Sequence, residues 1–409
     1  MLSSRSLRLF ANPRVARALP YRDEGRDEIL CLAAFSEAKR EITSWPGYQV
    51  TLLRRLTKLA AATDIDEILY KDEGERFGIG SFKALGGAYA VLRVLQRHIR
   101  ERGHGAVSSH ELASGRCRGL TSQVTVTCAT DGNHGRSVAW GARTFGAGCV
   151  IYLPEIVSEG RCRAIAAFGA QVRRVAGTFD DAVRQAAADA AAHSWQVVPD
   201  TVCAGCTSDA PRDVMQGYSL MIDEACAQCG AIPSHVFVQG GVGGLAAAAC
   251  AYLWERYADA RPCLVVVEPE KADCLLRSAM AGRPTPAQGP LDTIMGGLAF
   301  GEASPLAWRI LERGADAFVT IDDDAAIDCM RLLAEGRFGD EPVVAGESAV
   351  AGLAGLLMAC VDRDAREVLR LRADSRVLVF GTEGATDTDT YRSIVGRTPD
   401  EVLGVRRAR

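Results

Sequence analysis

The chain has 409 residues, a length that predicts two or three structural units; 48% are hydrophobic and 24% charged, which excludes a disordered or fibrous protein. The 47 Lys and Arg against 51 Asp and Glu give a net charge of −4 without a long block of one sign, so we expect neither nucleic acid nor a membrane as partner. No apolar run approaches the ~20 residues of a membrane-spanning helix. The first twenty residues lack the apolar region of a secretory signal, and we predict a cytoplasmic protein.

Short β-branched runs alternate with stretches of helical spacing along most of the chain, which predicts an α/β architecture with right-handed crossovers. Several runs are almost wholly apolar, as is typical of strands buried on both faces of a parallel sheet. The predicted strands are Gln123–Thr127, Cys149–Leu153, Gln171–Val175, Trp195–Val198, His235–Gln239, Leu264–Glu268, Phe318–Ile321 and Val377–Phe380. The helical stretches include Asn133–Phe145, Phe179–His193, Val214–Cys226 and Ala272–Met280.

The chain has fourteen cysteines, which are scattered and, without a secretory signal, are expected to be reduced thiols. Cys203, Cys206, Cys226 and Cys229 form a CxxC-x19-CxxC pattern that matches a four-thiolate zinc site. In the alternative interpretation one pair lies in a loop and the other on a helix, and the four sulfurs do not meet. Because the rest of the chain supplies a large core, folding needs no metal, and we expect none.

A glycine-rich loop follows the predicted strand His235–Gln239. It reads Gly240-Gly241-Val242-Gly243-Gly244 and leads into an Ala-rich helix. Such a loop directs successive N–H groups to one point, and the helix dipole adds positive potential, so the segment is suited to bind a phosphate. It has neither the Lys-Ser/Thr ending of a P-loop nor the GxGxxG order of a dinucleotide site. The alternative is a tight turn beside a closely packed helix.

Two further segments contain side chains with catalytic chemistry. Lys83 precedes small and apolar residues, and burial would lower the pKa of its amine and make it a nucleophile or base; the alternative is a surface lysine. Thr130-Asp131-Gly132-Asn133-His134-Gly135 follows a predicted strand and begins a helix. The same residue types also cap helices, so helix capping is the alternative interpretation there.

Together these segments resemble the fold-type II pyridoxal-phosphate enzymes, the group of the tryptophan synthase β-subunit and threonine dehydratase. The closer resemblance is to the diaminopropionate ammonia-lyases, and it extends from about Tyr48 to Arg392. It rests on Lys71-Asp-Glu73, Arg76-Phe-Gly, Phe82-Lys83, Leu85-Gly-Gly-Ala-Tyr89, Thr130-Asp-Gly-Asn-His-Gly-Arg136, Val138-Ala-Trp140, Met215-Gln-Gly-Tyr218, Val267-Glu-Pro269, Gly346-Glu-Ser348 and Thr382-Glu-Gly384.

The resemblance implies a role for each matching residue. Lys83 would bind pyridoxal phosphate as a Schiff base, Asn133 would hydrogen-bond the ring hydroxyl, and Thr382 would face the pyridine nitrogen. Asp131 and Asp200 would be the catalytic carboxylates, a pair associated in the related enzymes with handling both enantiomers of the substrate. The phosphate would be bound by the glycine-rich loop, that is by Gly240, Gly241, Val242, Gly243 and Gly244.

The resemblance also implies the fold and the reaction. We expect two three-layer α/β/α domains with mostly parallel sheets and the cofactor in the cleft between them. Residues 1–95 with 213–409 would form the large cofactor-binding domain, and 96–212 a smaller inserted domain. The implied reaction is the α,β-elimination of 2,3-diaminopropionate, a small amino acid, to pyruvate and ammonia, by a homodimer. The alternative is a β-replacement synthase or a hydroxy-amino-acid dehydratase of the same superfamily.

The sequence departs from the family pattern beside the expected substrate. Cys203 and Cys206 stand where aromatic residues are usual, Ala349 replaces a glycine, and Phe300 replaces a small residue or cysteine. The segments expected to bind the cofactor keep the pattern. The departures therefore concern the choice of substrate rather than the cofactor.

Overall fold

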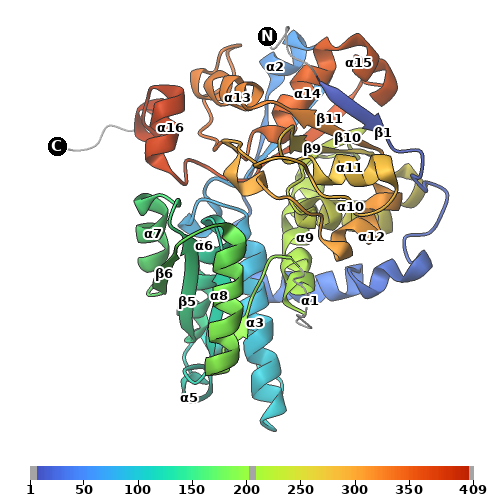
Figure 1. Cartoon of the computed structure of the whole chain (residues 1–409). Coiled ribbons are helices and arrows are strands. Elements are labelled where there is room, and N and C mark those ends of the chain that lie inside the picture. Colours follow the sequence, from blue (N-terminus) through green and yellow to red (C-terminus); the bar gives the residue numbers. More distant parts are fainter. Residues whose placement is uncertain (1–6, 202–208, 405–409) are drawn as a thin grey trace. The chain divides into compact units, whose positions relative to one another are not determined.

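The computed structural model describes residues 7–201 and 209–404. Its described residues form two compact units, each of which is considered by itself (Figure 1). The first unit comprises residues 7–31, 50–75 and 222–404, and the second comprises 32–49, 76–201 and 209–221. Each unit contains one largely parallel sheet with helices on both faces, so the predicted α/β architecture is confirmed.

The first unit is built on a seven-stranded sheet in the order β1-β10-β9-β8-β11-β3-β2. The five central strands are parallel, and the short β1 and β2 pair antiparallel at the two edges. All five residues of β8 are buried, as expected for a strand covered on both faces. The strands are β1 (Arg8–Ala11), β2 (Leu52–Arg55), β3 (Glu67–Asp72), β8 (His235–Gln239), β9 (Cys263–Pro269), β10 (Ala317–Ile321) and β11 (Arg376–Gly381).

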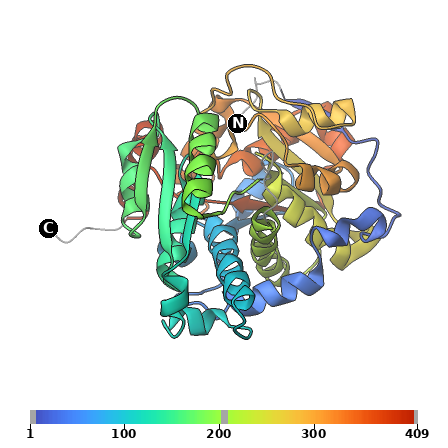
Figure 2. The same cartoon turned by 60° about the horizontal axis from the view of Figure 1, so that its bottom comes forward.

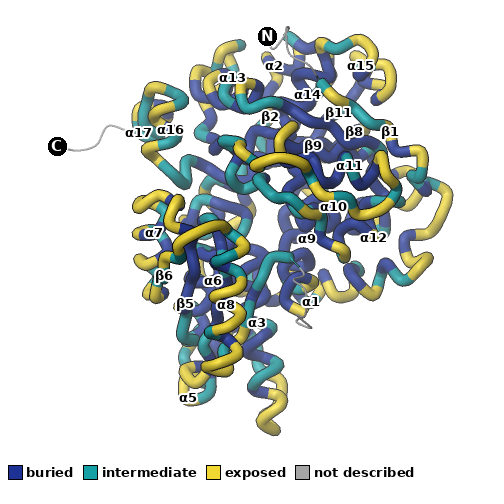
Figure 3. The backbone as a smooth tube through the Cα atoms, viewed as in Figure 1, coloured by how far each residue is buried: buried dark blue, intermediate teal, exposed yellow. Residues whose placement is uncertain are grey.

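The direction of the crossovers places the helices of the first unit on opposite faces of its sheet. From β8 through β9 to β10 the chain moves toward one edge of the sheet, and it then returns past β8 to β11. Because crossovers between parallel strands are right-handed, helices that connect strands in one direction and in the other lie on opposite faces of the sheet. The wholly apolar α14 packs on the central strands and is dark blue, that is buried, in Figure 3; the apolar face of α13 belongs to the same core. The helices are α2 (Thr57–Ala62), α10 (Gly244–Tyr257), α11 (Cys274–Ala281), α12 (Pro305–Gly314), α13 (Asp323–Glu335), α14 (Ala351–Val361), α15 (Arg363–Leu369), α16 (Thr388–Val395) and α17 (Pro399–Val402).

The second unit contains a four-stranded parallel sheet in the order β6-β5-β4-β7. Here too the chain reverses direction across the sheet, and α8 packs on one face while α6 packs on the other (Figures 1 and 2). Its elements are α1 (Leu32–Ile42), α3 (Lys83–Glu101), α4 (Ser109–Ala113), α5 (Arg118–Thr121), β4 (Thr125–Ala129), α6 (Asn133–Phe145), β5 (Gly148–Pro154), α7 (Glu159–Ala166), β6 (Gln171–Val175), α8 (Phe179–His193) and β7 (Gln196–Val197).

The boundaries of the compact units differ from those of the domains predicted from the sequence. The structure groups α3 with the small sheet because α3 packs closely on α6: a Cβ on Gly141 would lie 2.7 Å from the Cα of Ala88. The division falls within α9 (Ala210–Gln228), so the beginning of that helix also belongs to the second unit. The domains 1–95 with 213–409 and 96–212 remain a prediction about cofactor binding. Within the described residues, none of the helices is both long and apolar enough to cross a membrane.

Candidate active site

Lys83 is the first residue of α3, and its amine is directed to a carboxylate of the same unit. Its Nζ donates a hydrogen bond of 3.1 Å to Oδ2 of Asp200, and the two side chains are only 18% and 13% exposed. Burial acts to lower the pKa of Lys83, but the nearby Tyr218, Asp200 and Asp131 outweigh it and raise the pKa. The side chain is thus enclosed rather than on the surface, but the expected lowering of its pKa is wrong, because the neighbouring carboxylates and Tyr218 outweigh burial.

Asp131 and Asp200 both follow the carboxyl ends of neighbouring parallel strands. β4 and β7 lie side by side, and the backbone N–H of Val198 donates to the carbonyl oxygen of Thr127 at 2.8 Å. The carboxyl ends of parallel strands are where ligands bind in open α/β sheets. This register brings the two aspartates, 69 positions apart in the sequence, to the same edge of the small sheet.

The two carboxylates have different electrostatic environments. Burial acts to raise the pKa of Asp200, but the Lys83 ammonium and His134 outweigh burial and lower it. The pKa of Asp131 is raised by burial, although the charges of Arg161 and Lys83 oppose this change. Asp200 is therefore the carboxylate that stays ionised beside Lys83, whereas Asp131 is the better proton acceptor.

The loop that carries Asp131 is held by residues other than the predicted catalytic ones. The hydroxyl of Thr130 accepts the N–H groups of Gly132 and Gly135 at 3.0 and 3.1 Å, so this threonine satisfies the start of α6. Nε2 of His134 donates to the carbonyl oxygen of Val198 at 2.7 Å. Because Val198 lies two residues before Asp200, this bond connects the loops that carry the two aspartates. Sequence reasoning did not assign these supporting roles.

The glycine-rich loop lies in the first unit, between β8 and the fourteen-residue α10. Gly241 and Gly243 have positive φ angles of 60° and 95°, which glycine adopts without strain. A Cβ on Gly240 would lie 2.5 Å from Cγ of Glu268, so no larger residue fits there. The chain thus enters a long helix through a glycine-lined turn, an arrangement suited to bind a phosphate.

Thr382 lies at the same edge of the large sheet as the glycine-rich loop. It follows β11 directly, and β11 is the parallel neighbour of β8, after which the loop begins. Thr382 is 4% exposed. The first unit thus brings together two of the predicted cofactor-binding segments, and the second unit brings together Lys83, Asp131, Asn133 and Asp200 through α3, the start of α6 and the end of β7.

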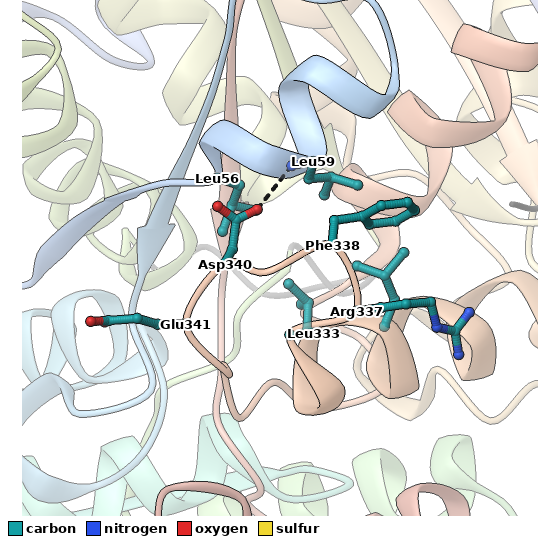
Figure 4. Close-up of a pocket in the computed structure, with 9 residues that line it drawn as sticks. Leu56, Leu59, Leu333, Arg337, Phe338, Asp340 and Glu341 are labelled. Atoms are coloured by element: carbon teal, nitrogen blue, oxygen red, sulfur yellow. Dashed lines mark hydrogen bonds between the residues drawn. The ribbon is translucent and has the colours of Figure 1, made fainter.

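A small pocket of the first unit has none of these residues in its lining (Figure 4). Leucine side chains of α2 and α13 form its walls, and Asp340 accepts the backbone N–H of Leu59 at 2.9 Å. The carboxylate therefore caps a short helix. This pocket contains none of the predicted catalytic or cofactor-binding residues and is not the candidate active site.

The zinc pattern cannot be assembled from the described part of the chain. Cys203 and Cys206 lie outside the described residues. Burial raises the pKa of Cys226 to about 12 and that of Cys229 to about 11, which favours the protonated thiols over the thiolates that zinc binds. Among the described residues no group of three or more His, Cys, Asp or Glu could hold a metal ion.

Comparison with known proteins decides the family. The family model described as "Pyridoxal-phosphate dependent enzyme" matches residues 45–383. This chain belongs to the pyridoxal-phosphate-dependent enzymes. The family membership confirms the predicted fold class and the predicted cofactor, pyridoxal 5'-phosphate.

Relatives within this family agree with the resemblance found in the sequence. The diaminopropionate ammonia-lyase of Escherichia coli (strain K12) is 39% identical over 358 residues, which cover 85% of this chain and 88% of that protein. The enzyme of the same name from Salmonella typhimurium (strain LT2) is 37% identical over 365 residues, covering 86% and 89%. The crystal structure of the Escherichia coli enzyme in complex with D-serine superposes with a TM-score of 0.84 at 33% identity, covering 96% and 97%.

The residues of both units fit pyridoxal phosphate. The left-handed glycines before α10 form a tight turn into the N-terminus of a long helix, where a phosphate is favoured, and Lys83 is an enclosed amine that is bonded to a carboxylate. Thr382 offers a neutral hydroxyl, rather than a charge, at the sheet edge where the loop lies. Each unit, considered by itself, thus contains groups of the kinds that suit this cofactor.

Proposed function

We propose that this chain is a pyridoxal-phosphate-dependent carbon–nitrogen lyase that converts 2,3-diaminopropionate to pyruvate and ammonia. The observation that carries the proposal is the pair of aspartates at the carboxyl ends of β4 and β7, with Asp200 bonded to Lys83. A substrate with two amino groups is attracted by two carboxylates. The relatives that match most of the chain are named for this reaction.

We further propose how the chain's own residues hold the cofactor. Lys83 would hold the cofactor through its aldehyde group, Asn133 would hydrogen-bond its ring hydroxyl, and Thr382 would face its pyridine nitrogen. The phosphate would be held by the N–H groups of Gly240, Gly241, Val242, Gly243 and Gly244. Pyridoxal phosphate, when bound, withdraws electrons from the Cα of the attached amino acid and so makes its Cα–H acidic. A neutral threonine, rather than an acid, at the pyridine nitrogen limits this withdrawal.

The remaining steps of the proposed reaction are proton transfers by side chains. Asp131, whose pKa is raised, accepts the Cα proton of one enantiomer, and the β-amino group leaves as ammonia. Asp200 assists with the other enantiomer and keeps the ammonium of Lys83 in place. The aminoacrylate that is released hydrolyses to pyruvate and a second ammonia.

A direct assay tests this function. Purified protein with bound cofactor is incubated with D- and with L-2,3-diaminopropionate, and pyruvate and ammonia are measured; we expect one pyruvate and two ammonia per turnover. If a β-replacement synthase is the correct alternative, an added thiol will consume the substrate without forming pyruvate. A hydroxy-amino-acid dehydratase will turn over serine or threonine faster than diaminopropionate. No turnover of either enantiomer by the parent protein will contradict the proposal.

The roles of the aspartates are tested by exchanging each for its amide. Asp131→Asn is expected to reduce kcat/KM for D-diaminopropionate more, and Asp200→Asn that for the L enantiomer more, by ~10²–10⁴-fold, as is typical when a general base is removed. Asn preserves the shape of each side chain, and each variant is the control for the other. Equal losses with both enantiomers would reduce the aspartates to groups that bind the substrate's ammonium.

We also propose that the protein is a cytoplasmic homodimer, and that its cofactor-binding domain comprises 1–95 with 213–409. The family resemblance supports the dimer, and the many unpaired thiols among the described cysteines agree with a reducing compartment. Light scattering is expected to give twice the mass of one chain. A monomer, or recovery in a membrane or secreted fraction, would contradict these proposals.

A further inference from the structure

Tyr218 belongs to the second unit and lies close to Lys83, although its motif was not assigned a role. It is on α9, and its ring packs against Phe82 with 4.6 Å between ring centroids. Gly86 leaves the space for this ring, because a Cβ there would lie 2.4 Å from Cε1 of Tyr218. A Cβ on Gly217 would lie 2.2 Å from the carbonyl oxygen of Leu85. The two glycines therefore let α9 approach α3 closely enough to place the tyrosine beside Lys83.

The hydroxyl group of Tyr218 is buried; among the described residues Lys83 interacts with it, but that contact does not reach good hydrogen-bond geometry. The side chain is 2% exposed. Nζ of Lys83 lies 5.9 Å from the centroid of the ring, and the ammonium lowers the pKa of the phenol while burial, the larger effect, raises it to about 12. Buried hydroxyl groups are normally hydrogen-bonded. An unsatisfied one next to a functional lysine indicates a partner that is engaged during the reaction.

Every charged or titratable group near Lys83 in this unit can be named. Asp200 accepts one of the three ammonium protons, and Asp131 and His134 interact with the amine electrostatically. With a pKa of about 12, Tyr218 is neutral at physiological pH and presents an oxygen that can accept a second proton of the ammonium. Tyr218 is thus a neutral oxygen acceptor beside two carboxylates and a histidine.

We propose that Tyr218 is a positioning residue for Lys83, whose hydroxyl oxygen accepts a hydrogen bond from the Lys83 ammonium and so makes the free amine a stronger base. The inference rests on the proposed role of Lys83 in cofactor binding. Whenever the amine of Lys83 is free and protonated, its ammonium is held by Asp200 and Tyr218 together. The phenol itself neither gains nor loses a proton.

The test replaces only the hydroxyl group. Tyr218→Phe keeps the ring that packs on Phe82, and Tyr391→Phe is the matched control. Tyr391 lies on α16 of the first unit, is 1% exposed, has a pKa raised to about 12 by burial, and also has no hydroxyl partner among the described residues. Both variants remove one buried, unsatisfied hydroxyl, but only one of these is near Lys83.

The first measurement does not depend on turnover. The bound cofactor is removed from the full-length protein, and the rate of pyridoxal-phosphate incorporation is followed by absorbance as a function of pH, because only the neutral amine of Lys83 reacts. Loss of an acceptor destabilises the ammonium, so the midpoint of the profile for Tyr218→Phe is expected to fall by about one pH unit. In the holoenzyme, kcat is expected to fall about tenfold with KM changed less than twofold. Tyr391→Phe is expected to match the parent in both measurements.

Several outcomes would overturn the inference. These are an unchanged pH midpoint in Tyr218→Phe, or equal shifts in Tyr218→Phe and Tyr391→Phe. If Tyr218→Phe does not fold, 4-fluorophenylalanine is placed at position 218; its fluorine fills the space of the hydroxyl but is a very weak acceptor, and an unchanged midpoint then refutes the role. A parent protein that incorporates the cofactor at Lys83 but does not turn over diaminopropionate would contradict the proposed function, and the pH midpoint would still test Tyr218.

Discussion

A buried lysine of the first unit is expected to determine much of the stability of the protein. Lys71 lies on β3 and has no exposed surface. Its Nζ lies 2.8 Å from each of three acceptors: the carbonyl oxygen of Thr51, Oε1 of Gln228 and Oε2 of Glu224. All three ammonium protons are therefore used. Glu224 is itself 4% exposed, so the ion pair is shielded from water and from salt.

Lys71→Met keeps most of the length of the side chain but removes its charge. The carboxylate of Glu224 then stays buried without its cation, and two other acceptors lose a donor. Removing one partner of a buried ion pair typically costs about 3–5 kcal/mol, and this is the expected loss in the free energy of unfolding. That loss is a large fraction of the ~5–15 kcal/mol by which native proteins are stable.

The measurement is urea unfolding followed by circular dichroism, with two comparisons. Arg337→Met removes an exposed ion pair with Glu335 and is expected to cost less than about 1 kcal/mol. The double variant Lys71→Met/Glu224→Leu, which removes both buried charges, is expected to be more stable than Lys71→Met alone. If Lys71→Met costs no more than Arg337→Met, or if the double variant is no more stable than Lys71→Met, the reasoning is refuted.

Three further variants test the cofactor site and a buried acid. Lys83→Ala is expected to abolish turnover and the visible absorbance of the bound cofactor. Normal activity together with a borohydride-reducible attachment of the cofactor at another lysine would contradict the role of Lys83. Replacing Gly241 and Gly243 together by Val places side chains at left-handed backbone positions. The affinity for pyridoxal phosphate, measured by equilibrium titration, is expected to fall more than tenfold. An unchanged affinity in the folded variant would refute the phosphate site. Burial raises the pKa of Glu268 to about 8, so the folded state binds the proton of this carboxyl more tightly than the unfolded state does. The stability that results from this tighter binding is fully present below the unfolded pKa of ~4.3 and is lost as the pH rises through about 8. The Tm is therefore expected to fall more steeply between pH 5 and 9 in the parent than in Glu268→Gln. Parallel curves of Tm against pH in the two proteins would contradict the raised pKa of Glu268.

The elements that the sequence predicted best are those defined by local patterns. β8 and α6 have the predicted bounds, because an apolar run followed by glycines, or a polar turn followed by helical spacing, is contained within a few residues. β4 begins two residues later than predicted, and β7 is only two residues long. The sequence analysis did not predict β1, β2 or β3. β1 and β2 are edge strands of only four residues, which is too short for a clear pattern. β3 contains Lys71, a charged residue that interrupts the apolar pattern of a buried strand although its side chain is buried.

The candidate site was predicted as separate segments, and the structure shows which of them meet. Lys83 and Asp200 are 117 residues apart, and their hydrogen bond follows from the packing of α3 beside the small sheet rather than from any motif. The role of Thr130 at the start of α6 was not predicted, since Thr, Asp and Asn are all suitable caps at that point. The proposed roles of Asn133, Thr382 and the two aspartates remain predictions.

The sequence by itself determined the α/β fold class, because turns, apolar strands and glycine-rich loops are properties of neighbouring residues; the family and the cofactor followed from the resemblance of its motifs. The tertiary structure alone decided which charges face one another. Long-range pairs such as Lys71 with Glu224 and Lys83 with Asp200 depend on strand register and helix packing, and the position of Tyr218 depends on a missing Cβ at Gly86. The sequence specifies the identity of an ionisable side chain but does not show whether that side chain is solvated or buried. Only the fold sets the local dielectric and the partners from which its pKa and its chemistry follow.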